Sequence, residues 1–413
     1  MTRASRARDA LCTACGREHG LGRIYRCEAC GAPLDVRYDY ARIPRAAFDP
    51  PARDRGRGLW IFADLLPVAP DAAITLGEGQ TPLLACRKLG ERLGLDRLWV
   101  KDETRQPTGS FKDRPLSVAV SRARELGFDT VVTASSGNAA AAMAAYAAQG
   151  GLRAVVIVPA DAPPPKLFQM LASGARVVRV RGSVSDCIQL AQAAARGCGW
   201  CNVTSTFENP YSVEGDKTVA YELARDLGWR APDWIAVPTG SGPLPVGIYK
   251  GFAEMQRAGL IERLPRMVAA QAEGCAPIAR AFRSGAAEVT PWADARTIAG
   301  GIQDPLVGYS QDGTRTLGVV RQSGGAAVAL PDAAIEEATR WMARDEGVYV
   351  EPTAAVATAA VAALRGTGTI RDGETVVVIA TGHGLKQPVV RAQEADALPT
   401  IDPHLEAFRA LGL

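Results

Sequence analysis

The sequence predicts an α/β protein with mostly parallel sheets, and three observations point to that fold class. Seven short apolar segments rich in valine, isoleucine and alanine are typical of buried strands. Helical segments alternate with them, which is the order that parallel strands with helical crossovers require. The composition is that of a globular protein, because 47% of the 413 residues are hydrophobic and 22% are charged. This length is sufficient for two or three domains.

The expected elements can be placed by residue number. The expected strands are residues 97–101, 130–135, 153–159, 176–180, 234–240, 266–272 and 375–382. The expected helices are residues 112–126, 138–149, 164–173, 184–196, 214–227, 245–258, 332–346 and 353–364. Residues 41–58 are rich in proline, arginine and glycine and predict a linker after the N-terminal part of the chain.

Charge and hydropathy argue against several classes of function. The formal net charge of +3 is too small to be the footprint of a nucleic-acid-binding protein. The basic first ten residues are not followed by an apolar segment, so we expect no secretory signal. The longest apolar run, residues 139–148, is too short to span a bilayer. We therefore expect no membrane partner, no nucleic-acid partner and a cytoplasmic location.

Four of the nine cysteines lie in two pairs near the N-terminus, Cys12-x-x-Cys15 and Cys27-x-x-Cys30. Two turns of this kind can offer four thiolates to one tetrahedral Zn²⁺ ion. Gly16 and Gly31 follow the pairs, where such turns need a permissive backbone. Residues 1–40 therefore predict a zinc ribbon whose closed, four-ligand site is structural. A further pair, Cys198 and Cys201, has redox-type spacing, but nothing else supports that role, so we expect both to pack in the core.

Three expected strands run into polar, glycine-rich turns, the place where open α/β sheets bind ligands. The first turn is Ser135-Ser136-Gly137-Asn138, and the second, Gly240-Ser241-Gly242-Pro243-Leu244, precedes a helix from about Pro245. The third turn, at residues 381–384, contains Thr381. Turns that precede helices direct N–H groups at anions. Together with Lys112 in "TGSFKDRP", they suit pyridoxal 5′-phosphate and an amino-acid carboxylate.

Six stretches, in order from about residue 76 to 387, resemble the threonine synthase family of fold-type II pyridoxal-phosphate enzymes. They are "EGQTPL" (78–83), "PTGSFKDR" (107–114), "SSGN" (135–138), "NPYSVEGDKT" (209–218), "EPTAA" (351–355) and "TGHGLK" (381–386). The resemblance implies two open, twisted, mostly parallel sheets with flanking helices, and some members of the family carry an N-terminal zinc ribbon. It also implies a homodimer, a large cofactor-binding domain (59–107 and 216–413) and a small mobile domain (108–215).

The resemblance assigns a role to each candidate site residue. Lys112 is the lysine of the internal aldimine and then the general base, and Phe111 packs beside the cofactor. Asn138 donates to the ring hydroxyl, and Thr381 meets the pyridine nitrogen. The phosphate cradle is Gly240, Ser241, Gly242, Pro243 and Leu244, and the substrate carboxylate is lined by Ser135, Ser136 and Gly137.

Simpler interpretations of four residues stay open from the sequence alone. Lys112 can be a surface lysine at a helix start, and Asn138 can be a helix N-cap. Thr381 can be a turn residue. Glu351 either contacts the cofactor region or only starts a helix at the following proline. Asp113 and Arg114, next to Lys112, are expected to form a structural ion pair.

Two departures from the family pattern concern the substrate. Threonine synthases read NPYRLEGQK where this chain reads NPYSVEGDK, so the arginine that binds the substrate phosphate is replaced by Ser212. Loss of each charge-assisted hydrogen bond costs about 1.5–3 kcal/mol. Leu244 replaces an asparagine that also serves the substrate in the family, and Pro243 removes one N–H donor.

Two enzymatic functions therefore compete, and both act on a small amino-acid substrate. The first is threonine synthase, in which O-phosphohomoserine and water give threonine and phosphate through aldimine and quinonoid intermediates. The second is β-elimination or β/γ-replacement on a non-phosphorylated substrate, as in serine or threonine ammonia-lyases or specialised amino-acid biosynthesis. A third hypothesis, a zinc-ribbon binding protein, fits poorly with the balanced charge.

Overall fold

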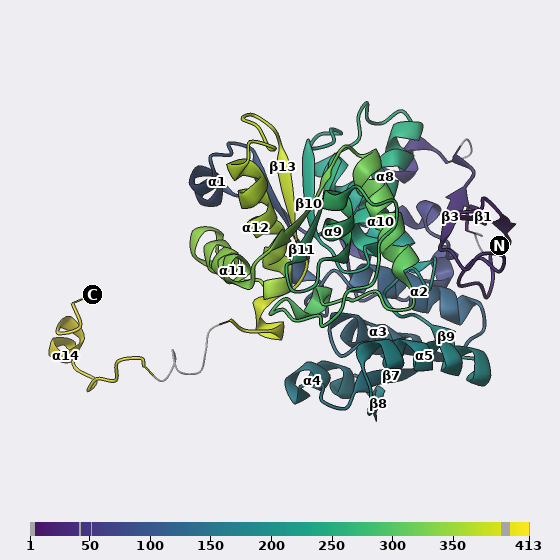
Figure 1. Ribbon diagram of the computed structural model, residues 1–413, viewed down its shortest axis with the longest axis horizontal. Helices are drawn as coiled ribbons and strands as arrows, with labels where there is room; N and C mark the ends of the chain where they lie inside the picture. Colours follow the sequence, from purple (N-terminus) through teal and green to yellow (C-terminus); the bar gives the residue numbers. More distant parts are fainter. Residues whose placement is uncertain (1–4, 41–42, 51, 390–396, 413) are drawn as a thin grey trace.

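The computed structural model describes residues 5–40, 43–50, 52–389 and 397–412, which contain three sheets (Figure 1). The first is a small antiparallel sheet in the order β2-β1-β3, built from β1 (Ala7–Cys12), β2 (Glu18–His19) and β3 (Leu34–Tyr38). Both cysteine pairs are in or next to this sheet. Gly16 and Gly31 have φ of +72° and +71°, so the expectation of permissive turns after the cysteines is confirmed.

The second sheet has six strands in the order β12-β11-β10-β13-β5-β4. The strands are β4 (Leu83–Ala85), β5 (Leu98–Asp102), β10 (Trp234–Pro238), β11 (Arg266–Ala272), β12 (Ala326–Leu330) and β13 (Val376–Ala380). All neighbouring pairs are parallel except the edge strand β4, which is antiparallel to β5. Parallel strands of this kind must be covered on both faces, which explains their continuous apolar sequences.

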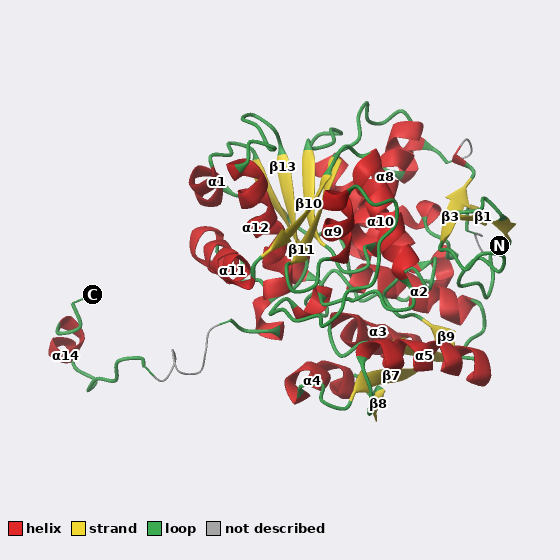
Figure 2. Ribbon diagram, viewed as in Figure 1, coloured by secondary structure: helices red, strands yellow, loops and turns green. Residues whose placement is uncertain are grey.

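Successive residues of each central strand point to opposite faces of this sheet. In β10, Ala236 packs in the core cluster that contains the alanine-rich helix α12 (Pro352–Gly366), together with α11 (Asp332–Glu346). Ile235 and Val237 pack in the opposite cluster with α7 (Thr218–Asp226) and α8 (Pro243–Arg257). Figure 2 shows helices on both sides of the sheet.

The third sheet has the parallel order β8-β7-β6-β9. Its strands are β6 (Thr130–Ala134), β7 (Arg153–Pro159), β8 (Arg176–Val180) and β9 (Cys201–Asn202). Helices α2 (Asp113–Glu125), α3 (Asn138–Gly150) and α4 (Pro164–Ala172) pack on one face, and α5 (Val184–Cys198) packs on the other. This sheet lies below the large one in Figure 1. The domain boundaries expected from the sequence, and the motion of the small domain, stay predictions.

The seven expected strands and seven of the eight expected helices are confirmed. The eighth expected helix, 214–227, is wrong in one respect. The chain there forms two helices, α6 (Ser212–Asp216) and α7, which are divided at Lys217. Elements that the sequence did not reveal include the strands β4 and β12. The helices missed are α1 (Arg87–Leu93), α9 (Pro277–Ser284), α10 (Ser310–Gln322) and the short C-terminal α14 (Leu405–Arg409), which lies apart from the other elements in Figure 1.

Parts of the expected linker pack against helices α7 and α8. Residues 41–42 and 51 lie outside the described residues, but Ile43 and Phe48 are buried in the cluster with α7 and α8. The ring of Phe48 meets that of Tyr221 edge-on, with 5.3 Å between centroids. Whether the segment acts as a linker stays a prediction. Among the described residues, none of the helices is long and apolar enough to cross a membrane.

Candidate active site

Lys112 lies directly before α2, in the wall of a cleft of about 730 Å³ between the large sheet and the small parallel sheet. Its Nζ donates a hydrogen bond to Ser205 Oγ and lies 4.4 Å from the centre of the Phe111 ring. Burial lowers the pKa of the Lys112 amine, while the carboxyl groups of Asp216, Asp304 and Glu351 oppose that shift. A lysine with a lowered pKa can take up a proton near neutral pH.

The polar turn after β6 forms a second part of the wall. Ser135, Ser136, Gly137 and Asn138 all line the cleft, and α3 begins at Asn138. Gly137 donates its backbone N–H to Ser135 Oγ at 3.2 Å, which tightens the turn. The free N–H groups at the start of a helix favour an anion such as a carboxylate.

The strand end of β13 holds the Lys112 motif in place. Phe111 donates its backbone N–H to the carbonyl of Thr381 at 2.9 Å, and Ser110 forms an isolated bridge with Gly382. Thr381 is 2% exposed, and its Oγ1 has no hydrogen-bond partner among the described residues. An unpaired buried hydroxyl is costly, so this oxygen is suited to a partner that the protein itself does not supply.

Glu351 lies beside this turn and lines the cleft. Asn138 donates from Nδ2 to Glu351 Oε1 at 2.8 Å, so the interpretation in which Glu351 only starts a helix is wrong. Burial raises the pKa of Glu351 to about 7, although Lys386 and the Asn138 hydrogen bond act in the other direction. A Cβ at Gly382 would lie 2.5 Å from Glu351 Oε1, so any larger residue there would displace the Glu351 carboxyl group.

The expected phosphate cradle follows β10 and leads into α8. Gly242 has φ of +106°, and a Cβ there would lie 2.0 Å from Thr316 Oγ1, so only glycine fits. Thr316 Oγ1 also donates to the carbonyl of Ser241 at 2.7 Å. Pro243 is the first residue of α8, and Leu244 is buried. None of residues 240–244 lines the cleft, but a Cβ on Gly240 would lie 3.3 Å from the Cβ of Asp304, which does line it.

Asp304 was missed by sequence reasoning because no motif surrounds it. Tyr309 donates its hydroxyl to Asp304 Oδ1 at 2.5 Å, and burial raises the pKa of the Asp304 carboxyl. A neutral carboxyl can donate a hydrogen bond to an anion, whereas a carboxylate would repel it. The raised pKa favours the neutral carboxyl, which repels an anion near Gly240 less than a carboxylate would.

Two lysines on the rim of the cleft were also missed as site residues. Lys386 Nζ donates to the carbonyl of Thr108 at 2.8 Å and to Gln169 Oε1 at 2.6 Å. Lys166 Nζ lies 3.1 Å from the position of a Cβ on Gly300, and both residues line the cleft. Lys386 belongs to a motif that the sequence reveals, whereas Lys166 comes from α4 with no local signal. They place positive charge near Glu351, whose carboxyl interacts with both.

Ser212 does not lie with these groups. It is buried on α6, where its Oγ has no partner among the described residues, and it does not line the cleft. Two other expectations are wrong. Arg114 pairs with Glu103 and Glu222 rather than with Asp113. Cys201 packs in the core as expected, but Cys198 is exposed.

The four N-terminal cysteines converge as the sequence predicts. The sulfur atoms of Cys12, Cys15, Cys27 and Cys30 all lie within 4.8 Å of one another. Cys12 Sγ is 3.4 Å from Cys30 Sγ, and Cys15 Sγ is 3.6 Å from Cys27 Sγ. Four thiolates at tetrahedral positions around Zn²⁺ are separated by about 3.8 Å, so the cluster has nearly the size of a metal site.

Comparison with known proteins places this site in a family. Residues 74–382 match the model of the pyridoxal-phosphate dependent enzymes. The threonine synthase of Methanocaldococcus jannaschii is 39% identical over 388 residues, covering 93% of this chain and 94% of that protein. The threonine synthase of Methanosarcina acetivorans is 38% identical and covers 96% and 97%. The chain therefore belongs to the pyridoxal-phosphate-dependent enzyme family. Within it, the chain groups with the threonine synthases.

Solved structures confirm the fold-type II architecture. An L-serine ammonia-lyase from Rhizomucor miehei superposes with a TM-score of 0.64 at 23% identity, covering 73% of this chain and 93% of that chain. A threonine deaminase isoform 2 from Solanum lycopersicum superposes with a TM-score of 0.63 at 23% identity, covering 76% and 81%. At this identity the likeness is one of fold alone.

The residues present fit pyridoxal 5′-phosphate. The amine of Lys112 is buried and has a lowered pKa, as bonding to the cofactor aldehyde requires. Thr381 Oγ1, which has no partner among the described residues, can meet a ring nitrogen, and at Gly242 there is no room for a side chain. The enzyme therefore uses pyridoxal phosphate, with a set of donors that suits each part of the cofactor.

Proposed function

We propose that this enzyme converts O-phosphohomoserine and water into threonine and phosphate. The observation that carries the proposal is the distribution of charge in the cleft. A proton-accepting amine, Lys112, is joined in the same cleft by two further ammonium groups, on Lys166 and Lys386. A phosphorylated amino acid needs both features, one at its α-carbon and one at its distal phosphate. The near full-length similarity to curated threonine synthases supports the same substrate.

The bound cofactor supplies an electron sink for negative charge that develops at the substrate carbons. Lys112 would bond to the cofactor in the resting enzyme, and its freed amine would move protons at the α-carbon of the substrate. The hydrogen bond to Ser205 Oγ fixes the direction of the Lys112 amine. The turn at Ser135, Ser136 and Gly137 binds the substrate carboxylate. Asn138 is fixed by Glu351, so its amide can orient the cofactor ring.

The other residue roles follow the same logic. Thr381 Oγ1 meets the ring nitrogen, Phe111 packs beside the cofactor, and the cradle of residues 240–244 binds the cofactor phosphate with backbone N–H groups. Lys166 and Lys386 bind the substrate phosphate in place of the arginine that Ser212 replaces. The closed cleft excludes water until the phosphate has left, when water adds to the substrate.

The direct test is an assay of the purified enzyme loaded with pyridoxal phosphate. We expect release of inorganic phosphate from O-phosphohomoserine and formation of threonine in equal amounts. Borohydride reduction and peptide mapping should find the cofactor on Lys112. An unmodified Lys112, or absence of both products, would eliminate the proposal.

The lysine roles have a separate test. Lys166→Ala should raise KM for O-phosphohomoserine about tenfold or more, because a charge-assisted contact of about 1.5–3 kcal/mol is lost. Lys88→Ala, at an exposed position on α1, is the matched control and should leave KM unchanged. Equal KM values for the two variants would show that Lys166 does not bind the phosphate.

A second candidate function rests on Ser212. Its uncharged side chain replaces the family arginine, which favours a non-phosphorylated substrate and a β-elimination or replacement reaction. In that case serine or threonine would yield ammonia and a keto acid, or a product substituted at Cβ. A keto-acid assay on both amino acids, run beside the phosphate assay, separates the two functions.

We further propose that Cys12, Cys15, Cys27 and Cys30 bind a structural Zn²⁺ ion, because four convergent sulfur atoms with no other function suit that metal. A homodimer is proposed from the family resemblance. The nine free thiols are compatible with a reducing compartment, so we propose a cytoplasmic location. Metal analysis should find about one zinc per chain.

A further inference from the structure

We propose that the ribbon loop, residues 20–26 between the two cysteine pairs, positions residues 204–212, which we call the cleft segment. Arg26 is the main positioning residue. This inference is independent of the substrate, because it concerns how Lys112 and its neighbours are held. The cleft segment 204–212 has one side in the cleft and the other side against the ribbon. Its three leading residues, Thr204, Ser205 and Thr206, line the cleft.

Arg26 extends from the ribbon to two carboxyl groups of the enzyme body. Its Nε donates to Glu208 Oε2 at 2.8 Å, and its Nη2 donates to Asp312 Oδ2 at 3.1 Å. Glu208 belongs to the cleft segment, whereas Asp312 belongs to α10 of the large domain. The three side chains are 18%, 10% and 0% exposed, so solvent screens these charges only weakly. Arg26 therefore connects the cleft segment to the large domain.

Asp312 completes this connection. Its Oδ2 also accepts the backbone N–H of Phe207 at 3.1 Å, so the carboxylate binds the cleft segment directly. Burial raises the pKa of Asp312 to about 6, and the guanidinium of Arg26 opposes that shift. Removing Arg26 would leave two buried carboxyl groups without their cation. Glu208 would then lose its partner, and Asp312, which holds the N–H of Phe207, would lose the group that fixes its carboxylate.

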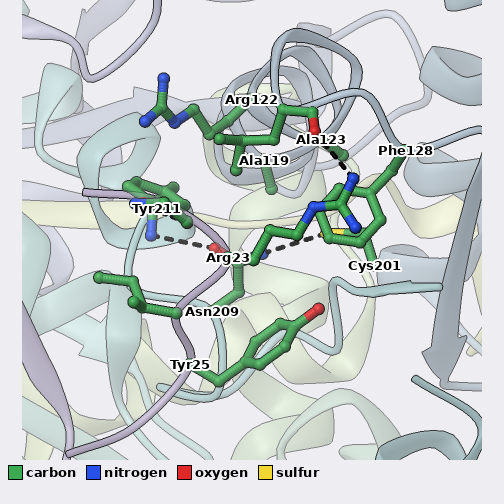
Figure 3. A pocket seen from close by; sticks show the side chains of 12 residues that line it. Arg23, Tyr25, Ala119, Arg122, Ala123, Phe128, Cys201, Asn209 and Tyr211 are labelled. Atoms are coloured by element: carbon green, nitrogen blue, oxygen red, sulfur yellow. Dashed lines mark hydrogen bonds between the residues drawn. The ribbon is translucent and has the colours of Figure 1, made fainter. Parts of the chain in front are cut away.

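A second set of contacts holds the other end of the cleft segment. Tyr211 donates its hydroxyl to the carbonyl of Gly22 at 2.8 Å and accepts the N–H of Gly22 at 2.9 Å. Tyr25 accepts the N–H of Asn202, just before the segment, at 3.1 Å. Figure 3 shows Tyr25, Tyr211 and Arg23 gathered at this junction, which surrounds a crevice of about 10 Å³. The junction is thus closely packed rather than a ligand site.

Ser205 connects the contacts of Arg26 to the amine of Lys112. Ser205 lies three residues before Glu208 and accepts the hydrogen bond from Lys112 Nζ. Its position is set on one side by Thr204, whose Oγ1 accepts the N–H of Ala134 at 3.2 Å. On the other side, its position is set by the hydrogen bonds of Arg26 to Glu208 and Asp312. The ribbon therefore acts on the chemistry through Ser205, without contact with the substrate.

The test uses full-length enzyme loaded with pyridoxal phosphate and a substrate-independent probe. Hydroxylamine removes the cofactor from its lysine, and the rate of this loss is followed by visible absorbance. Arg26→Ala and Glu208→Ala should each accelerate the loss roughly tenfold, the effect of one lost charge-assisted bond. The double variant should be no faster than Arg26→Ala alone, because both changes remove the same contact. Arg26→Lys, which keeps one charged contact, should be intermediate.

Arg23→Ala is the matched control. Arg23 belongs to the same loop and stacks on Phe128 at 4.1 Å, and its Nη2 donates to the carbonyl of Leu126, but it bonds no residue of the cleft segment. It should lose the cofactor at the wild-type rate. Equal rates for Arg26→Ala, Glu208→Ala and the wild type would overturn the proposal, as would an Arg23→Ala variant as fast as Arg26→Ala. Glu208→Ala leaves the ribbon unchanged, so it also separates the effect from misfolding of the ribbon.

Discussion

The amine of Lys112 is kept in a form that can accept a proton. Burial lowers its pKa, and the carboxyl that opposes this shift most, Asp216, is itself difficult to ionise. Burial raises the pKa of Asp216 to about 8, and its Oδ1 has no hydrogen-bond partner among the described residues. Asp216 is therefore largely protonated at neutral pH and does not lock Lys112 into an ion pair. A lowered pKa favours the neutral amine, which is the form that can bond to the cofactor and accept a proton.

Thr381→Val should maintain or increase the stability of the cofactor-free protein, but should lower its affinity for the cofactor. Thr381 Oγ1 is buried and has no partner in the described part of the chain, so the isosteric change should leave the cofactor-free protein equally stable or stabilise it by about 1 kcal/mol. Affinity for pyridoxal phosphate should fall about 2- to 10-fold, because one neutral hydrogen bond is lost. Urea unfolding of the cofactor-free protein and a cofactor titration measure the two effects.

Thr381→Ser is the control, because it keeps the hydroxyl and should retain cofactor affinity. If Thr381→Val binds the cofactor as tightly as the wild type, the hydroxyl does not contact it. If the variant destabilises the cofactor-free protein by several kcal/mol, the hydroxyl has a partner within the protein.

The sequence predicted the site residues that lie in motifs, and missed those that only the fold brings together. Lys112, Asn138 and Thr381 each follow a strand or precede a helix in a recognisable turn, and all three line the cleft. Asp304 and Lys166 come from segments without such patterns. Their role depends on contacts with residues far away in the chain, and hydrophobic periodicity carries no information on those contacts.

At the scale of elements, long apolar strands were predictable and short or alanine-rich ones were not. Strand β13 reads Val-Val-Val-Ile-Ala, a composition that predicts a strand. In contrast, β12 reads Ala-Ala-Val-Ala-Leu, a composition equally suited to a helix. Its pairing with β11 decides the matter, which is a tertiary effect. At α6 the chain packs closely against the start of α2, where a Cβ at Gly215 would lie 2.2 Å from the carbonyl oxygen of Arg114.

The start of α2 is held by a buried ion cluster, and breaking it should be costly. Arg114 Nη1 lies 2.7 Å from Glu222 Oε1 on α7, and Nη2 lies 2.8 Å from Glu103 Oε1. Lys101 on β5 also pairs with Glu222, at 2.8 Å. Arg114→Ala would leave buried carboxylates with too little positive charge, so we expect a loss of about 3–5 kcal/mol in the free energy of unfolding.

The comparison for this prediction is a solvent-exposed pair of the same type. Arg340 and Glu336 are one turn apart on α11, and their side chains are 44% and 26% exposed. Arg340→Ala should cost no more than about 0.5 kcal/mol. Urea unfolding of both variants measures the difference. A similar small loss for Arg114→Ala would mean that the cluster contributes little to stability.

Removal of the metal should affect the ribbon first and the active site second. Chelation of the proposed Zn²⁺ removes the cross-link between the turns at both ends of the ribbon loop. We expect increased proteolysis within residues 5–40, followed by faster loss of cofactor through the Arg26 contacts. Cys27→Ser should reproduce both effects without a chelator. Cys187→Ser, at a buried cysteine outside the cluster, is the control and should keep the ribbon resistant.

At the scale of the whole molecule, buried carboxyl groups should make the cofactor-free protein less stable as pH rises. Burial raises the pKa of Glu351 and Asp113 to about 7 and that of Asp216 to about 8. Between their usual and raised pKa values, the folded protein binds more protons than the unfolded chain. The free energy of unfolding must then fall as pH increases.

The expected decrease lies between about pH 5 and pH 8, and each group contributes at most about 1.4 kcal/mol per pH unit. Glu351→Gln keeps an oxygen that can accept from Asn138 Nδ2 but cannot ionise, so it should flatten the pH dependence and stabilise the protein most at pH 8. Urea unfolding of both proteins at pH 5, 6, 7 and 8, without cofactor, measures the two slopes. Parallel slopes would show that Glu351 ionises as easily in the folded protein as in the unfolded chain. A wild-type stability that rises over this range would contradict the raised pKa values of these carboxyl groups, because groups with lowered pKa values, such as Glu222 and Asp35, titrate below it.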